Sequence, residues 1–582
     1  MPTDLSQFKL PSRSDVPEEM RVQFEAFFKS KMGDLLSEMN AETSPDDALF
    51  RDELAGSPLE VKTSPQRGRG LYAARDIKAG ELVWRAPKLT AGETLLKTKP
   101  LVSVLSKPNL YEPAAGQKME LHCNHCYLLK PAQRCSGCKG VYYCGAACQQ
   151  ADWPSHKTEC KALTRVRQLW VQSYPEKAKD GLNNSWIQAE GARALGLLTW
   201  ARKAYRDQHG RDPDYWPKVE KMYAEGPDMG TGVHGIPAAD QMAIHLSYYV
   251  GAAEPPKDPN NLELIDMEPY GFQDEQLMSF VRSFVLNAFT LSSFDLKPIG
   301  VAMSPLLALF NHSCAPNAAI VFPRGGKEMV AVANADIAAG EEVLTTYVDI
   351  SDDKETRQGD LQSRYGFECE CPACTLDAVD PRNCLLHECG GLARMPADLR
   401  QMSDSETVKC DTCGASWTVS PNALRDLVNG GLSLVEADDQ DQLDPDDLPR
   451  VAEVIARLEE IMPPSSRPLL RLHTIAKNLH VPAAQPEALA YAHKALAGAY
   501  KVYPRNHPSV ALLRAESANL AAQIAVHIAE NGPGISEDEI KRCIADLRTA
   551  ADHCDLAFGK ESTIATSLRG FAQDMDVSLQ AM

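Results

Sequence analysis

Closely spaced cysteines constrain the fold of this chain more than any other feature of its sequence. The chain has 17 cysteines, and most occur as C-x2-C pairs or near variants of that spacing. The densest part, residues 121–160, holds enough ligand residues for two tetrahedral zinc sites. Because so short a segment has little core of its own, metal binding should supply much of its folding free energy. The ligands are Cys123, Cys126, Cys135, Cys138, Cys144, Cys148, His156 and Cys160.

Length and composition narrow the class of protein. A chain of 582 residues is too long for one hydrophobic core and should divide into several units. Its net charge of −19 argues against attraction of the whole molecule to nucleic acid. Long apolar runs and a secretory signal are both missing, so we expect no membrane span and a location in the cytoplasm, the nucleus or both. In an intracellular protein, clustered cysteines favour zinc over disulfides.

The hydrophobic pattern alternates between strand-like and helical sequence. Short strands separated by glycines are predicted from Leu59 to about Pro100, and strand-like sequence returns from Ala318 to Tyr347. Residues 161–286 and the sequence after about Pro421 predict helices, the last of which stack like tetratricopeptide repeats. We therefore expect an α+β fold. The predicted C-terminal helices are Leu448–Met462, Leu469–Leu479, Glu487–Val502, Pro508–Asn531 and Ser536–Phe558.

The first cysteine block resembles a MYND zinc finger, with Tyr143, Gln149 and Trp153 at matching positions. In that family the ligand pairs interleave. The resemblance implies one ion on Cys123, Cys126, Cys144 and Cys148, and a second on Cys135, Cys138, His156 and Cys160. Lysines and arginines surround the block, and a solvated surface explains them most simply. A face that binds peptide or nucleic acid is the alternative.

Further motifs resemble those of SET-domain methyltransferases. The most specific is Phe310-Asn311-His312-Ser313-Cys314-Ala315-Pro316-Asn317, which is similar to the N-H-S-C-x-P-N signature. A glycine turn precedes it, and a G-E-E…Y strand and a cysteine-rich segment follow it: Arg67–Leu71, Gly340–Tyr347 and Tyr365–Cys374. Each motif alone is weak evidence, but their order is specific. The MYND block between the first motif and the rest identifies the chain as similar to the SMYD (SET and MYND domain) family.

The resemblance implies a β-rich SET domain split by a MYND finger and a helical insert, with a post-SET zinc segment and a helical C-terminal domain. The expected units are an N-terminal helical extension at 1–57, the first SET part at 58–120, MYND at 121–160, the insert at 161–286, core SET at 287–350, post-SET at 351–376, a zinc knuckle at 377–420 and the C-terminal domain at 421–582.

The implied activity is transfer of a methyl group from S-adenosylmethionine to a lysine side chain in a histone or non-histone protein. By resemblance, Tyr347 orients the amine, Tyr365 forms a wall of the lysine channel and Phe289 lines it. Phe367 is implied to stack near the adenine. The full set of implied cofactor contacts is Arg67, Arg69, Asn287, Asn311, His312 and Phe367.

Two more metal sites are predicted. Cys369, Cys371 and Cys374 supply three thiolates, and in the SMYD family Cys314 is the fourth ligand. The pairs Cys384-x4-Cys389 and Cys410-x2-Cys413 predict a further zinc knuckle from spacing alone. His387 is an alternative ligand, but a bystander role was the simpler interpretation. Cys543 and Cys554 lie in helical sequence and are expected to be buried core residues.

The main alternative to an enzyme is an inactive adaptor whose MYND finger binds a proline-rich partner segment. Tyr347, Asn311 and His312 are all present, and a decayed site would be expected to lose them. A regulator that binds nucleic acid rests only on the local basic residues. For the enzyme we expect a protein or peptide substrate, no membrane association and a monomer.

Overall fold

The computed structural model describes most of the chain beyond the N-terminal segment. The predicted helix Glu18–Met39 lies outside the described residues, which are 47–54, 57–65, 67–74, 82–85, 102–106, 121–129, 133–179, 187, 189–227, 238–254, 266–322, 329–396, 405–439, 442–480, 486–531, 534–560 and 562–581.

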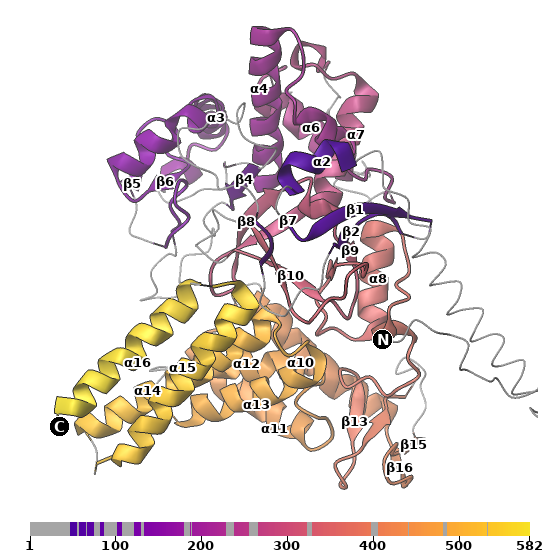
Figure 1. The fold of residues 1–582 in the computed structure, drawn as a ribbon, viewed down its shortest axis with the longest axis vertical. Helices are drawn as coiled ribbons and strands as arrows, with labels where there is room; N and C mark the ends of the chain where they lie inside the picture. The colour runs from indigo at the N-terminus through magenta and orange to yellow at the C-terminus, as the bar shows by residue number, and fades with distance from the viewer. Residues whose placement is uncertain are drawn as a thin grey trace, which may run out of the picture.

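Small sheets and one short helix, α2 (Asp47–Leu54), build the β-rich part at the centre of the molecule (Figure 1). Three sheets carry it: the hairpin β1–β2, the three-stranded sheet β10–β11–β3 and the three-stranded sheet β4–β8–β7. Their strands are β1 (Leu59–Ser64), β2 (Gly68–Ala73), β3 (Leu82–Arg85), β4 (Val102–Leu105), β7 (Ala288–Ser292), β8 (Pro298–Met303), β10 (Ala318–Val321) and β11 (Val330–Ala333).

The segment 340–347 is paired on two sides. Its first residues bond to the backbone of β2, since Ala73 N–H donates to Glu341 and Val343 N–H donates to Leu71. Its last residues form β12 (Leu344–Thr345), which runs parallel to β9 (Asn311–His312). Three sequence-distant stretches, namely the glycine turn, the Asn-His motif and the strand before Tyr347, therefore meet at one place.

The cysteine-dense block contains the β5–β6 hairpin (Gln133–Arg134 and Tyr142–Tyr143) and the long helix α3 (Ala146–Ser173). The helical insert lies beside it and above the sheets in Figure 1, and its core gathers around Trp216, Phe272 and Phe280. The helices are α4 (Glu190–His209), α5 (Trp216–Glu220), α6 (Ala238–Val250) and α7 (Asp274–Asn287), with the 3-10 turns η2 (Lys177–Lys179) and η4 (Glu268–Tyr270).

The C-terminal helices pack in succession. The five helices predicted between Leu448 and Phe558 are confirmed to within about three residues, and the structure adds one helix before them and one after them. Buried side chains of α14–α16 pack directly on Val321, Val330 and Val332 of the β10–β11 pair, so this domain lies against the central sheet (Figure 1). The helices are α10 (Pro421–Asp439), α11 (Leu448–Glu459), α12 (Leu469–Leu479), α13 (Pro486–Val502), α14 (Pro508–Asn531), α15 (Glu537–Phe558) and α16 (Thr563–Ala581), with η6 (Pro445–Asp447) before α11. The α+β class is confirmed.

Two hairpins and a short connecting stretch join the central domain to the C-terminal helices. The stretch follows α8 (Lys354–Tyr365) and α9 (Pro372–Thr375), and the hairpins are β13–β14 (Cys384–Leu386, Leu392–Arg394) and β15–β16 (Glu406–Lys409, Ser416–Val419). In the described residues, no helix is both long and apolar enough to cross a membrane.

Arg382 is the main polar contact at this joint. Its side chain is buried, its Nε donates to Ile350 O at 2.6 Å, and its Nη2 donates to Val502 O at 2.7 Å. Asp380 pairs with the same guanidinium at 3.1 Å. One side chain thus satisfies backbone acceptors from both the central domain and α13.

We predict that Arg382→Ala lowers the free energy of unfolding by about 2–4 kcal/mol, because two buried carbonyl groups lose their donor. Urea denaturation followed by circular dichroism measures this change. Arg394→Ala is the matched control, because its partner Asp377 is almost fully exposed and such surface pairs contribute little. Equal effects of the two substitutions would contradict the role given to Arg382.

Candidate functional site

A carboxylate holds the glycine turn against the Asn-His motif. Glu342 accepts from Arg67 Nη1 at 2.9 Å and from Asn311 Nδ2 at 2.8 Å. Asn311 Nδ2 also donates to Arg69 O at 3.0 Å. Both bonds of Asn311 use its amide nitrogen, so its side-chain oxygen is the atom left for a ligand. Arg69 itself reaches the insert, where its guanidinium donates to Lys221 O.

The two glycines of the turn have different reasons to be glycine. Gly68 has a φ of +67°, and a Cβ there would meet nothing within 4 Å, so the requirement is conformational and the backbone is open on that side. At Gly70 a Cβ would lie 2.6 Å from Glu342 Oε1 and 3.0 Å from Asn311 Nδ2. Gly70 is therefore required by the close approach of the Glu342–Asn311 pair.

The buried His312 ring connects two parts of the site. Its Nδ1 accepts the backbone N–H of Tyr347 at 3.0 Å, so that nitrogen carries no proton. Its Nε2 lies 3.3 Å from Cys314 Sγ and is then the donor. The imidazole thus fixes the backbone of the predicted active-site tyrosine relative to a cysteine of the third metal set.

The hydroxyl of Tyr347 is oriented by the main chain. It donates to Phe310 O at 2.7 Å, which leaves only lone pairs on the hydroxyl oxygen for another group. Burial, followed by the neighbouring Tyr365, raises the pKa of Tyr347 above its ordinary value. The side chain is therefore a neutral hydroxyl that can accept a hydrogen bond from a substrate.

Aromatic rings gather around this hydroxyl, and we call His312, Tyr347, Tyr365 and Phe367 the aromatic group. The Tyr347 and Tyr365 ring centroids lie 4.9 Å apart, and Phe367 lies 6.4 Å from Tyr365 and 6.0 Å from His312. The structure thus brings together two predicted channel residues and two predicted cofactor contacts.

Two other predicted residues have different surroundings. Asn287, at the end of α7, donates its amide to Tyr223 O at 2.8 Å and to Ser283 O at 2.6 Å. Phe289 packs on the core of the central domain, and no ring contact joins it to the aromatic group in the described part of the chain. Their roles in cofactor binding and in the channel stay predictions.

The first block gathers into the two interleaved sets that the resemblance implies. Cys123, Cys126, Cys144 and Cys148 form one, and Cys135, Cys138, His156 and Cys160 form the other. The distance from Cys135 to Cys160 sulfur is 3.8 Å, and Cys138 sulfur lies 3.6 Å from His156 Nε2. These values agree with the ligand–ligand edges of about 3.6–3.8 Å in a tetrahedral zinc site.

A third set joins Cys314 to Cys369, Cys371 and Cys374, as expected, and a buried arginine supports a metal there. Arg357 of α8 is fully buried, and its Nε and Nη2 have no hydrogen-bond partner. Burial opposes its charge, but the Cys314 and Cys374 sulfurs raise the pKa of Arg357 on balance. Its Nη1 donates to Asp352 O and lies 3.9 Å from Asp380. A zinc ion on four thiolates carries a net negative charge, which would suit the two guanidinium nitrogens that have no such partner.

The fourth set differs from the prediction in one ligand. Cys389, Cys410 and Cys413 come together with His387, and Cys384 is not part of the set. Cys384 lies in β13, fully buried, whereas His387 begins the turn that follows this strand. The grouping predicted from spacing is therefore corrected, since His387 and not Cys384 lies with the other three residues.

A buried ion pair that the sequence does not reveal supports the second metal set. His156 Nδ1 lies 2.9 Å from Glu159, and Arg193 Nε of α4 donates to the same carboxylate at 2.8 Å. Arg193 Nη1 continues to Leu105 O of β4 at 2.9 Å. Burial would raise the pKa of Glu159, but Arg193 and then His156 hold it at about 2. This chain of contacts fixes the cysteine-rich block to the insert and the central sheet.

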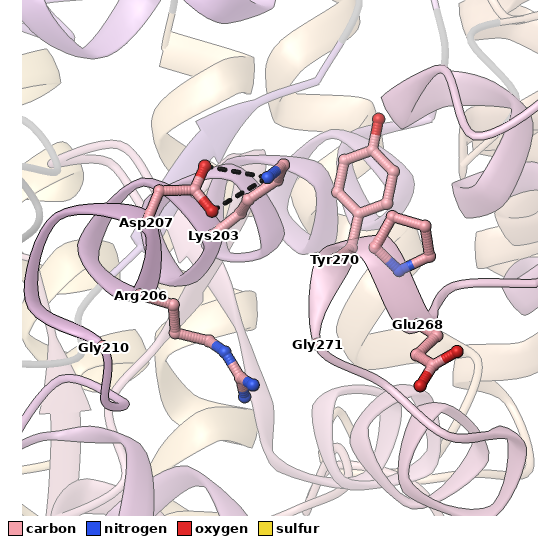
Figure 2. A pocket seen from close by; sticks show the side chains of 8 residues that line it. Lys203, Arg206, Asp207, Gly210, Glu268, Tyr270 and Gly271 are labelled. Atoms are coloured by element: carbon pink, nitrogen blue, oxygen red, sulfur yellow. Dashed lines mark hydrogen bonds and ion pairs between the residues drawn. The ribbon is translucent and has the colours of Figure 1, made fainter.

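A hollow of about 300 Å³ lies between the end of α4 and η4. Figure 2 shows the side chains that line it. Both of its basic side chains are paired, since Lys203 lies 2.8 Å from Asp207 and Arg206 lies 3.3 Å from Asp212. No member of the aromatic group lines it. This hollow is therefore separate from the predicted site.

Comparisons with known proteins agree with this arrangement. The SET domain family matches residues 68–348, from the glycine turn to just past Tyr347. Histone-lysine N-methyltransferase ASHR1 of Arabidopsis thaliana is 28% identical over 54% of this chain and 55% of its own length. N-lysine methyltransferase SMYD2-B of Xenopus laevis is 26% identical over 65% of this chain and 69% of its own length. The chain therefore contains a match to the SET domain family and is similar to lysine methyltransferases of the SMYD type.

Other similarities of this chain are also partial. Histone-lysine N-methyltransferase SMYD3 of Homo sapiens is 27% identical over 56% of this chain and 63% of its own length. The chain thus spans little more than half the length of several relatives. The solved SET domain of LSMT bound to lysine and AdoHcy covers 97% of this chain and 94% of its own, with 11% identity and a TM-score of 0.22. That score is too low to establish a common arrangement.

We predict that Glu159→Gln weakens zinc binding by this protein about 10- to 100-fold at one site, because His156 loses the carboxylate that orients it. Leaving Arg193 buried without its counter-charge should also cost roughly 3–5 kcal/mol of stability. Competition with a chromogenic chelator measures the first effect and urea denaturation the second. Glu176→Gln removes the same charge from an exposed pair and is the control. Identical behaviour of both variants would contradict the assigned role.

Proposed function

We propose that the protein is a protein-lysine N-methyltransferase that uses S-adenosylmethionine. The observation that carries this proposal is the aromatic group, which lies where the glycine turn, the Asn-His motif and the strand before Tyr347 meet. The matched SET domain and the relatives named as lysine methyltransferases support the same chemistry.

The cofactor would lie against the glycine turn and the Asn-His motif. When bound, S-adenosylmethionine supplies an electrophilic methyl group on a cationic sulfur. Asn311 offers its side-chain oxygen, which is a suitable acceptor for the ammonium of the cofactor's amino-acid part. The open backbone at Gly68 gives room for approach, and Phe367 offers a partly exposed ring for stacking on the adenine.

Tyr347 would orient the attacking amine. Because its own proton is held by Phe310 O, the hydroxyl can only accept, so it takes an N–H of the lysine and leaves the lone pair of that nitrogen free. Positioning of this kind accounts for much of the acceleration of an in-line displacement. Tyr365, packed 4.9 Å from Tyr347, forms an apolar wall beside the amine.

The lysine must lose a proton before it can react. With a reference pKa near 10.4, deprotonation at about pH 7.4 costs roughly 4 kcal/mol. Burial of the amine between aromatic rings disfavours the ammonium form and lowers that cost. Residues that exclude water here therefore take part in the chemistry as well as in binding.

The third metal set would hold the rings of Tyr347 and Tyr365 in place relative to each other. Cys314 contacts His312, which holds the Tyr347 backbone, and Arg357 connects the same cysteines to α8, the helix that ends at Tyr365. A zinc ion on Cys314, Cys369, Cys371 and Cys374 would thus position both tyrosines. We propose zinc in the two MYND-like sets as well, and a protein or peptide as the substrate.

We predict that Tyr347→Phe lowers kcat for methyl transfer about 100-fold, because the amine loses its acceptor. Binding of the cofactor, measured by calorimetry, should change less than about threefold, since no cofactor contact is assigned to this hydroxyl. The assay follows transfer of a labelled methyl group from S-adenosylmethionine to a histone mixture and a cell extract. Tyr500→Phe makes the same change on an exposed ring of α13 and should leave the rate unaltered.

Two results would count against this proposal. A wild-type rate in Tyr347→Phe would remove the tyrosine from the mechanism. If the unaltered protein neither binds the cofactor nor labels any protein, the adaptor that docks a proline-rich segment through its MYND-like finger becomes the better explanation.

The pH dependence gives a further prediction. At saturating cofactor, kcat/KM for a lysine peptide should rise about tenfold per unit from pH 7 to 9, as the neutral amine becomes more abundant. Tyr347 has a raised pKa and stays protonated across this range, so its ionisation does not lower kcat/KM at the alkaline end. Initial rates at each pH give the profile. Circular dichroism at the same pH values verifies that the protein stays folded. A decline between pH 8 and 9 in folded protein would contradict the assignment.

A further inference from the structure

The turns of two neighbouring hairpins face each other in the joint region. The turn after β13 carries His387 and Cys389, and the turn after β15 carries Cys410 and Cys413. Their ligand atoms all lie within 4.8 Å of one another. Figure 1 places these hairpins beside the C-terminal helices and far from the MYND-like block, so they form a separate unit.

The distances inside this set fit a tetrahedral ion. Cys389 and Cys410 sulfurs lie 3.6 Å apart, and His387 Nδ1 lies 3.5 Å from Cys413 sulfur. A zinc site with bonds of about 2.3 Å to sulfur and 2.0–2.1 Å to nitrogen has edges of roughly 3.6–3.8 Å. The same His387 nitrogen lies 3.1 Å from Cys389 sulfur, so it faces two of the three sulfurs.

Both turns have the backbone of a metal-binding knuckle. A glycine with positive φ follows the second ligand in each, with +80° at Gly390 and +73° at Gly414. In the second turn, the backbone amides of Thr412 and Cys413 point at Cys410 sulfur. At Gly391 a Cβ would come within 2.6 Å of the same sulfur, so only glycine lets the two turns approach.

The hairpins have too small a core to hold this geometry alone. In the described part of the hairpins, the buried apolar cluster consists of Leu385, Ala393 and Val408, which pack with Leu424 of α10. Apart from the bridge between Ala393 and Cys410, the direct backbone link between the hairpins is at Asp411, whose N–H donates to Leu392 O at 2.8 Å. Small units of this kind usually need a metal to fold.

We propose that His387, Cys389, Cys410 and Cys413 bind one zinc ion, and that this ion joins the two hairpins into a ribbon that braces the joint next to Arg382. Three thiolates and one imidazole in a tetrahedral set select zinc over magnesium or calcium. The ribbon contacts the C-terminal domain through Leu386 N–H, which donates to Ile461 O at 2.8 Å. The inference does not depend on methyl transfer.

Cys384 has a different role. Its strand pairs it with Arg394, and its buried side chain is excluded from the ligand set. The alternation of side chains along a strand, together with the position of the turn, brings His387 to the metal instead.

The test is the zinc content per chain, measured by mass spectrometry on folded, purified full-length protein. We expect four ions in the wild type, three in Cys413→Ser, and four in both Cys384→Ala and His387→Cys. After loading with cobalt, His387→Cys should shift the visible absorption to longer wavelength, because a fourth thiolate replaces nitrogen at one site. Cys384→Ala should leave the spectrum unchanged and serves as the matched cysteine control.

Three ions in the folded wild type would overturn the site. Loss of one ion in Cys384→Ala, together with an unchanged spectrum in His387→Cys, would show that Cys384 and not His387 is the fourth ligand. If Cys413→Ser does not fold, the wild-type count and the Cys384→Ala and His387→Cys spectra still decide, since those two variants retain four ligands.

Discussion

The two-sided pairing of segment 340–347 determines where everything else in the central domain can lie. Its main chain bonds to β2 on one side and to β9 on the other, while Glu342 holds Arg67 and Asn311 with its carboxylate. The glycine turn lies more than two hundred residues before the Asn-His motif and Tyr347 in the sequence. The pairing of segment 340–347 nevertheless makes all three neighbours in space. The MYND-like block and the helical insert lie between these motifs in the sequence, and the chain returns to the central domain after them.

Charge balance is the second theme of the structure. The second and third metal sets are rich in thiolates and buried, and their negative charge needs compensation from the surrounding protein. Arg193 reaches the second set through Glu159 and His156, and Arg357 faces the third set directly. Arg193 comes from the helical insert, so it also fixes the cysteine-rich block to its neighbour. Arg357 comes from α8, just before the cysteines at 369–374, and faces Cys314 of the central domain as well.

Much of this arrangement could be predicted from local sequence. Ligand spacing, helix periodicity and the motif around Asn311 are short-range patterns, and they located the metal sets, the C-terminal helices and the two tyrosines. The Glu159–Arg193 pair could not be found, because its members are 34 residues apart and no pattern links them. Arg357 was missed for the same reason. For the fourth set, spacing alone could not tell a strand residue, Cys384, from a turn residue, His387; only the direction of side chains along β13 separates them.

The contacts that run from His156 through Glu159 and Arg193 to Leu105 O have an evolutionary meaning. Replacing any one of these side chains leaves a buried charge or a buried donor without its counterpart, so single substitutions should be poorly tolerated. We therefore expect the three positions to change together among related sequences, if they change at all.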